Sequence, residues 1–289
     1  MIYYCADDFG LCRDTSTNIK KCLRDGVLNK ISVFPNFGEV DLKELTEIKN
    51  VRLSLHLNLV EGKCMANPEE IDLIAHKDGN LKHRFGGLFR LNFLCGKKLE
   101  EQLYKEILVQ VRYWQSILPK DIPFCIDSHQ HTHMIPAVFR ALVRVLKDEK
   151  IQADYVRIPA EPMLPFVTTQ SLYFTYNAVN VIKQWLLKFL WLCNKKHTKD
   201  YEIKTAYFFG ILFSGKMDEK RVKKLLPKYE KLAEKQGKDV EVLFHPGYID
   251  KLEYQLADKN VVFKDFYFSS GRKTEFECVR NISERSVKE

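Results

Sequence analysis

The sequence predicts an α/β protein in which about seven parallel strands form an open or complete barrel. Seven short apolar runs alternate with helix-like stretches along the chain. Most of these runs are continuously apolar, as is typical of strands buried on both faces of a parallel sheet. The length of 289 residues suits one large barrel, which commonly runs to about 250 residues, so we expect a single domain over 1–289.

The expected strands are short and rich in Val, Ile, Tyr and Phe. They cover Ile2–Ala6, Ile31–Phe34, Val51–Leu55, Phe124–Ile126, Tyr155–Ile158, Thr205–Phe208 and Val240–Phe244. The clearest helices between them cover Thr15–Arg24, Leu99–Ile117, Ala137–Lys147 and Glu219–Lys235. The first of these helices has a capping signal at Asp14/Thr15 and is expected to end at Gly26.

Two stretches interrupt this alternation and are expected to be lid-like insertions. Residues 61–98 show little periodicity, which predicts a long loop or lid after the third strand. Residues 166–198 are aromatic and apolar, but lysines interrupt them, and the uncharged runs fall far short of the about 20 residues of a membrane span. We expect an amphipathic helix over 178–193, with four possible roles: core packing, an oligomer contact such as a homodimer, a lid, or a membrane-surface contact.

Composition places weaker bounds on function. Forty-six Lys and Arg against 38 Asp and Glu give a net charge of +8, which does not by itself indicate a nucleic-acid partner. The eight cysteines are scattered without a Cys-x-x-Cys pair. The first ten residues have neither a basic n-region nor an apolar h-region, so we expect no signal peptide, reduced thiols and a cytoplasmic location.

Ionisable residues follow five of the expected strands at the point where each strand ends. They are Asp7-Asp8 after the first, His56 directly after the third, Asp127–His133 after the fourth, Arg157 in the fifth and His245 after the seventh. Because the carboxyl ends of parallel strands meet on one face of the fold, we expect these side chains to gather there.

Each of these residues also has a purely structural interpretation. Asp7-Asp8-Phe9-Gly10 could be a polar turn, His56 a buried core histidine and His245-Pro246-Gly247 a tight turn. The histidines at 129, 131 and 133 are more informative, because alternate residues of an extended segment point the same way and could share a face. Crowded imidazoles indicate metal binding or acid–base chemistry.

Together these residues suggest a site for one divalent metal ion. An ion that activates water needs a few anionic or imidazole ligands, and one Asp with two His meets that need. A second carboxylate can then take the proton of the water, and an opposing histidine can protonate the leaving group; the Asp7-Asp8 pair and His245 fit these roles. Two imidazole ligands favour zinc, cobalt or manganese over magnesium.

Four segments in this order resemble the YdjC-type carbohydrate deacetylases, which include chitooligosaccharide deacetylases and hopanoid-associated deacetylase-like proteins. The segments are ADDFG at 6–10, the histidine at 56, DSHQHTH at 127–133 and HPGYID at 245–250. The resemblance covers the chain from end to end. It implies a distorted (β/α) barrel, one divalent metal ion (magnesium or zinc), and removal of the N-acetyl group from an N-acetylated sugar.

Position by position, the resemblance implies that the metal ligands are Asp8, His56 and His129. It also implies that Asp7 is the base and His245 the acid, and that Arg157 orients Asp7 or the substrate. The same resemblance places His131 and His133 behind the ligands or in the pocket, where they could equally fix the loop by hydrogen bonds.

Three other functions are compatible with parts of this pattern. A phosphoesterase would suit the net charge of +8, but the sequence lacks a second carboxylate cluster for a two-metal site. A non-catalytic metal- or sugar-binding barrel would not need Asp7 beside Asp8, or His245. An enzyme acting on a glycolipid would use 178–193 as its membrane-surface contact.

Overall fold

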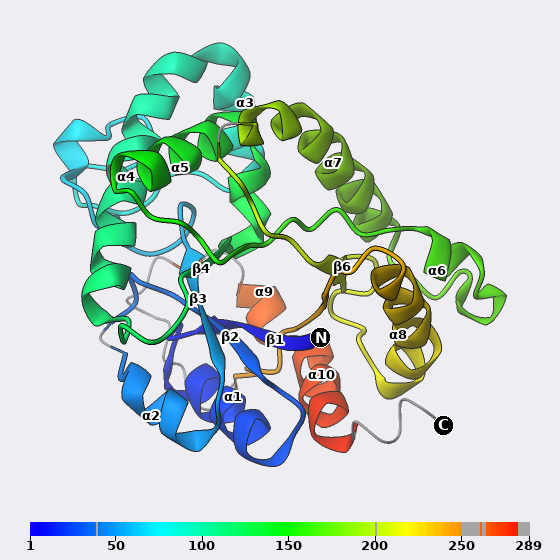
Figure 1. Ribbon diagram of the computed structural model, residues 1–289. Coiled ribbons are helices and arrows are strands. Elements are labelled where there is room, and N and C mark those ends of the chain that lie inside the picture. Colours follow the sequence, from blue (N-terminus) through cyan, green and yellow to red (C-terminus); the bar gives the residue numbers. More distant parts are fainter. Residues whose placement is uncertain (39, 200, 250–260, 262–263, 283–289) are drawn as a thin grey trace.

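The computed structural model describes residues 1–38, 40–199, 201–249, 261 and 264–282 (Figure 1). Seven strands form one sheet in the order β5-β4-β3-β2-β1-β7-β6, and all neighbouring strands are parallel. The strands are β1 (Ile2–Phe9), β2 (Lys30–Val33), β3 (Arg52–Leu57), β4 (Cys125–Ser128), β5 (Tyr155–Val156), β6 (Tyr207–Phe209) and β7 (Val240–Phe244). The prediction of seven parallel strands is therefore confirmed.

The sheet curls into a distorted barrel. Its two edge strands, β5 and β6, have only two and three residues. The backbone N–H of Val156 in β5 donates to the carbonyl of Lys204, just before β6, at 3.1 Å. This contact brings the two edges together and leaves the barrel irregular along that seam.

The inside of the barrel is polar. Arg157, which directly follows β5, reaches Asp7 of β1 and Glu241 of β7. Lys30 of β2 bonds Glu241 at 3.0 Å and lies 3.7 Å from Asp127 of β4. Because none of these strand pairs are neighbours in the sheet, the side chains must meet across the interior. The opposite charges offset one another there, as a buried charge requires.

Helices surround the strands at the periphery (Figure 1). The α-helices are α1 (Arg13–Asp25), α2 (Leu42–Ile48), α3 (Phe85–Leu94), α4 (Gly96–Ile117), α5 (Pro136–Asp148), α6 (Leu164–Val167), α7 (Ala178–Asn194), α8 (Glu219–Glu234), α9 (Lys264–Tyr267) and α10 (Ser270–Asn281). Four 3₁₀ turns are η1 (Pro68–Glu70), η2 (His129–Met134), η3 (Gln170–Leu172) and η4 (Lys195–Thr198).

The four predicted helices are present, with small shifts at their ends. The predicted cap of α1 at Asp14/Thr15 is wrong, since the helix begins after Cys12 and no side chain caps it. Asp218 caps α8 by accepting from the N–H of Arg221 at 2.8 Å.

The two insertions contain more helix than their sequences suggest. The prediction of a loop over 61–98 is wrong for 85–94, where α3 forms although two glycines stand in its first turn. Burial of Leu88 on this helix outweighs the low helix propensity of those glycines. The predicted amphipathic helix is α7. Core packing, one of its expected roles, holds for Leu187 and Leu190, whereas five other large apolar residues of the helix face solvent. Within the described ranges, no helix is both long and apolar enough to cross a bilayer.

Candidate metal centre

Two neighbouring aspartates at the end of β1 both have buried side chains beside the barrel interior. Successive side chains of a regular strand point to opposite faces. Here the register of β1 against β2 shifts between Ala6 and Phe9, and Asp8 has a φ of 71°. Asp is one of the few residues that tolerate this left-handed conformation. The irregular strand end therefore allows Asp7 to reach Arg157 while Asp8 reaches two histidines.

Asp8, His56 and His129 converge on one point. Oδ1 of Asp8 lies 3.5 Å from Nε2 of His56 and 3.1 Å from Nδ1 of His129. All three residues are buried, and one ligand atom from each can be chosen within 4.8 Å of the others. Among the described residues, Asp8 Oδ1 and His56 Nε2 have no hydrogen-bond partner. Buried polar atoms are normally paired, so a carboxylate oxygen and an imidazole nitrogen without partners fit a cation.

Other side chains fix the far side of each imidazole. Nδ1 of His56 bonds Oδ1 of Asp127 at 2.6 Å. Nε2 of His129 lies 3.2 Å from both Glu61 and Tyr267, whose hydroxyl donates to Glu61 at 2.5 Å. A carboxylate that accepts the proton of one ring nitrogen leaves the lone pair of the other free, which is how metal-binding histidines are oriented.

The charges around the three residues favour a cation at this position. Burial alone would raise the pKa of Asp8, but Arg272 and the two histidines outweigh it and hold that pKa well below its usual range. Burial alone would lower the pKa of His56, but Asp7, Asp127 and Asp8 raise it to about 10. The surrounding carboxylates thus attract positive charge to the ring.

A second group, Asp7, His56 and Asp127, also has ligand atoms within the same range. However, both oxygens of Asp7 already accept from Arg157, and Asp127 bonds His56 and two serine hydroxyls. Asp8, His56 and His129 are therefore the better candidate set.

Arg157 holds Asp7 from inside the barrel. Its Nη1 and Nη2 donate to the two oxygens of Asp7 at 2.7 and 2.8 Å, and its Nε donates to Glu241 at 2.7 Å. Burial alone would raise the pKa of Asp7, but the guanidinium of Arg157 outweighs it and lowers that pKa. Arg157 thus contacts Asp7, one of the two partners expected for it.

His129, His131 and His133 do not share a face, so the expectation of an extended segment is wrong. They lie in the 3₁₀ turn η2, where Gln130 and His131 have φ of 54° and 58°. Two left-handed residues in succession turn the three side chains apart. Only His129 reaches Asp8.

The other two histidines of the turn are neutral and buried. Nε2 of His133 donates to the carbonyl of Arg157 at 2.7 Å, and its Nδ1 accepts from the Ser128 hydroxyl at 2.5 Å. Burial lowers the pKa of His133 to about 4. His131 packs edge-on against Phe208. Burial, followed by the charges of Lys183 and Arg157, lowers the pKa of His131 well below its usual value.

His245 stands at the carboxyl end of β7 and is 13% exposed. Its backbone N–H donates to Glu275 of α10 at 2.5 Å, and its Nδ1 lies 3.4 Å from the same carboxylate. In the described part of the chain it has no hydrogen bond or ion pair with Asp8, His56 or His129. Asp250, the last residue of the HPGYID segment, lies outside the described residues.

Sequence reasoning missed several residues of this site. Asp127 begins the DSHQHTH segment, but the sequence pattern assigned no role to it. Glu61 stands at the start of the predicted loop over 61–98. Tyr267 and Arg272 come from α9 and α10, beyond the last predicted strand. Arg272 bonds both Asp8 and the carbonyl of Gly247, so it connects the centre to the segment after His245. No local pattern marks Tyr267 or Arg272, because their contacts with Glu61 and Asp8 span 206 and 264 positions.

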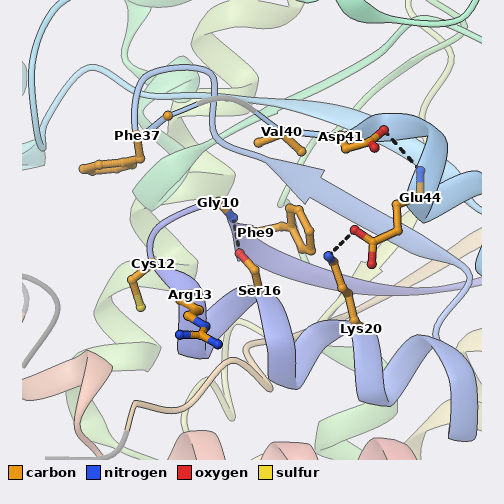
Figure 2. A pocket seen from close by; sticks show the side chains of 11 residues that line it. Phe9, Gly10, Cys12, Arg13, Ser16, Lys20, Phe37, Val40, Asp41 and Glu44 are labelled. Atoms are coloured by element: carbon orange, nitrogen blue, oxygen red, sulfur yellow. Dashed lines mark hydrogen bonds and ion pairs between the residues drawn. The ribbon is translucent and has the colours of Figure 1, made fainter. Parts of the chain in front are cut away.

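A hollow of about 270 Å³ lies beside the β1–α1 turn (Figure 2). Its lining includes Phe9, Arg13 and Phe37, and Lys20 pairs with Glu44 at its edge. None of the three candidate ligands lines it, so this hollow is separate from the metal centre.

The fold and the site together define a parallel α/β barrel with an Asp–His–His cluster at the carboxyl ends of its strands. The family model described as YdjC-like protein matches residues 1–283. The chain therefore belongs to the YdjC-like protein family.

Individual relatives agree with this assignment. The chain is 29% identical over 161 residues to a carbohydrate deacetylase of Danio rerio, covering 55% of this chain and 50% of that one. It is 26% identical over 152 residues to a chitooligosaccharide deacetylase of Yersinia pestis bv. Antiqua (strain Angola), covering 50% and 55%. The chain thus spans about half the length of these curated relatives.

The fold also has a solved counterpart. A crystal structure of a proposed cellobiose-phosphate cleavage protein of Enterococcus faecalis V583 superposes with a TM-score of 0.66. The superposition covers 99% of this chain and 92% of that one at 16% identity, which supports the distorted barrel.

Proposed function

We propose that this protein is a metal-dependent hydrolase that removes the N-acetyl group from an N-acetylated sugar. The observation that carries the proposal is the convergence of buried, unpaired ligand atoms from Asp8 and His56 with His129. The names of the relatives, carbohydrate deacetylase and chitooligosaccharide deacetylase, point to the substrate class.

Asp8, His56 and His129 would hold one divalent ion. One carboxylate and two imidazoles suit zinc better than magnesium, because magnesium prefers oxygen ligands. When bound, such an ion supplies Lewis acidity that polarises a carbonyl and makes water more acidic. Asp127, Glu61 and Tyr267 would keep the two imidazoles in the tautomer that binding needs.

Asp7 is the proposed base. Arg157 keeps its carboxylate ionised and fixed in direction, so Asp7 is ready to accept a proton from the attacking water. Arg157 is fully buried and acts as a positioning residue through Asp7.

His245 is the proposed acid that protonates the departing amine. Amide hydrolysis needs this step, since a free amide anion is a very poor leaving group. Glu275, 3.4 Å from Nδ1 of His245, would orient the ring toward the substrate. Phe266 packs edge-on against the same ring and limits its rotation.

The test is acetate release from N-acetylglucosamine oligomers by metal-free protein, and by protein reloaded with zinc or magnesium. Turnover should require the metal. Asp7→Asn should abolish turnover and still bind zinc, because Asp7 is not among the three ligands. Asp41→Asn, an exposed helix cap away from the centre, is the matched control. Metal binding without acetate release from any acetylated sugar would contradict the deacetylase proposal.

Phosphate release should be measured in the same assay. Lys183 of α7 has no hydrogen bond or ion pair in the described part of the chain, and the charge of Asp7 acts on it. Burial lowers the pKa of Lys183 to about 8. A lysine whose charge interacts with that of Asp7 would favour an anionic group on the substrate, so release of phosphate instead of acetate would favour a phosphoesterase.

A further inference from the structure

Helix α7 has apolar residues on two sides: Leu187 and Leu190 are buried in the core, and a second set of large apolar residues faces solvent. Each residue of this second set is between 56% and 69% exposed. They are Val179, Ile182, Trp185, Phe189 and Leu192, here called the outer stripe. Their spacing of three or four residues places them on one face of the helix.

Polar residues of α7 face the protein beside Leu187 and Leu190. Asn180 donates to the carbonyls of Leu212 and Ser214 at 3.2 Å. Gln184 donates to the carbonyl of Glu161 at 2.8 Å, and Asn194 to that of Met134 at 2.7 Å. These amide hydrogen bonds at three levels fix the rotation of the helix about its axis. The outer stripe is therefore held facing solvent.

Exposing apolar side chains to water costs free energy. Contiguous exposed apolar patches are therefore uncommon on soluble monomers. Two more exposed apolar side chains, Leu164 and Val167, stand on the short helix α6, which precedes α7 in the chain. Figure 1 shows α6 and α7 along the outer edge of the molecule. The exposure of five large apolar side chains on one face of α7 indicates a partner for this face.

The charge of the segment identifies the kind of partner. Residues 162–199 contain no Asp or Glu and five lysines, of which one, Lys183, is directed toward Asp7 and does not contribute to the surface. Lys195 and Lys196, directly after α7, are exposed. Lys188 lies at the flank of the stripe, with Nζ 5.5 Å from the centroid of the Trp185 ring. Trp, Phe and Leu on one face with lysines beside them are typical of helices that lie in the interface of a bilayer.

We propose that the outer stripe of α7 docks this protein on an anionic lipid bilayer, with the helix lying in the plane of the interface. The apolar side chains would enter the boundary between headgroups and acyl chains, and the lysines would contact anionic headgroups. The 17 residues of α7 give a contact about 26 Å long.

A second copy of the chain fits the charges less well. In a two-fold dimer the same surface meets itself, so the lysines of the segment would have to be offset by residues of the segment itself. No acidic residue between 162 and 199 could offset them. An anionic bilayer supplies the opposite charge.

The test is flotation of the full chain with vesicles of phosphatidylcholine alone and vesicles that also contain phosphatidylglycerol. The bound fraction on anionic vesicles should exceed that on neutral vesicles about tenfold and fall at about 1 M salt, where the Debye length is about 3 Å. The double variant Trp185→Gln, Phe189→Gln should lower the bound fraction about tenfold or more, because two large apolar contacts are removed. Phe93→Gln, at a side chain that is 72% exposed on α3, is the matched control and should not change it.

The lysines should contribute separately. Lys195→Gln with Lys196→Gln should weaken binding to anionic vesicles about fivefold per lysine, and leave binding to neutral vesicles unchanged. All four positions are exposed or at the surface, so the midpoint of urea unfolding should stay at its wild-type value. Failure to bind anionic vesicles, or equal binding to both kinds, overturns the proposal. A dimer in solution that Phe189→Gln dissociates also overturns it, in favour of a second copy.

Discussion

Replacing Asp127 by asparagine tests how the candidate metal centre is supported from behind. Asp127 does not belong to the proposed ligand set, yet its Oδ1 accepts from Nδ1 of His56 at 2.6 Å. Its Oδ2 accepts from the hydroxyls of Ser32 at 2.6 Å and Ser54 at 2.7 Å. In Asp127→Asn the carboxamide either turns its NH₂ toward His56 or presents an uncharged oxygen to it.

Both orientations weaken metal binding. An NH₂ facing Nδ1 requires that nitrogen to accept, which moves the proton of His56 to Nε2, the atom that faces Asp8. An uncharged oxygen keeps the tautomer but makes the imidazole a poorer donor to the ion. Removing such a supporting group typically costs about 10- to 100-fold in metal affinity. At about 1.4 kcal/mol per tenfold, this is about 1.4 to 2.8 kcal/mol.

The measurement is zinc affinity by calorimetric titration of the metal-free protein, together with the urea midpoint of each variant. Glu106→Gln is the matched control. Glu106 is also a buried carboxylate, but on α4 it accepts from the backbone N–H groups of Met65 and Ala66. Wild-type zinc affinity in folded Asp127→Asn, or an equal loss in Glu106→Gln, would refute the reasoning.

Three further predictions concern the frame around the site. Burial lowers the pKa of His133 to about 4 in the folded chain, against about 6.5 when unfolded. The contribution of the neutral His133 to the free energy of unfolding is therefore complete above about pH 6.5 and is lost as the pH falls toward 4. The total is about 3 kcal/mol, and urea unfolding of wild type and His133→Gln across this range should show a flatter dependence in the variant. Arg157→Met leaves Asp7 and Glu241 buried without their common partner, and should lower the free energy of unfolding by about 3–5 kcal/mol in the same assay. Gly247→Ala should destabilise by about 1–3 kcal/mol by thermal unfolding, because the added Cβ would lie 2.3 Å from Thr15 Cγ2.

Each of these predictions has its own control. If wild type and His133→Gln lost stability equally as the pH falls, the lowered pKa of His133 would not be the cause of the pH dependence. Arg157→Lys keeps the charge and should cost less than Arg157→Met; equal losses would mean that packing dominates. Thr15→Ser removes the methyl that the new Cβ meets, so it should recover stability in the Gly247→Ala background. Gly96→Ala has open space around its Cβ and should not destabilise.

Much of the fold follows from local patterns in the sequence. All seven strands were predicted because each is a short apolar run bounded by polar turns, and burial in a parallel sheet requires little else. The parallel arrangement also predicts that residues at strand ends gather on one face, which brought Asp8 and His56 into one hypothesis. The loop predicted over 85–94 failed for a local reason, since two glycines hid a helix that Leu88 anchors from a distance.

The sequence by itself determined the sheet, the residues at its carboxyl ends and the amphipathic character of α7. Only the tertiary structure decided which way those residues point. Asp8 approaches the histidines through a left-handed backbone conformation in an irregular strand end, and η2 turns His131 away from His129. The amides of Gln184 and Asn194 on α7 bind backbone carbonyls, which fixes the helix so that its outer stripe faces solvent. The physical reason is the same in each case: periodicity sets which side chains share a face, but hydrogen bonds and ion pairs with residues far along the chain set what that face meets.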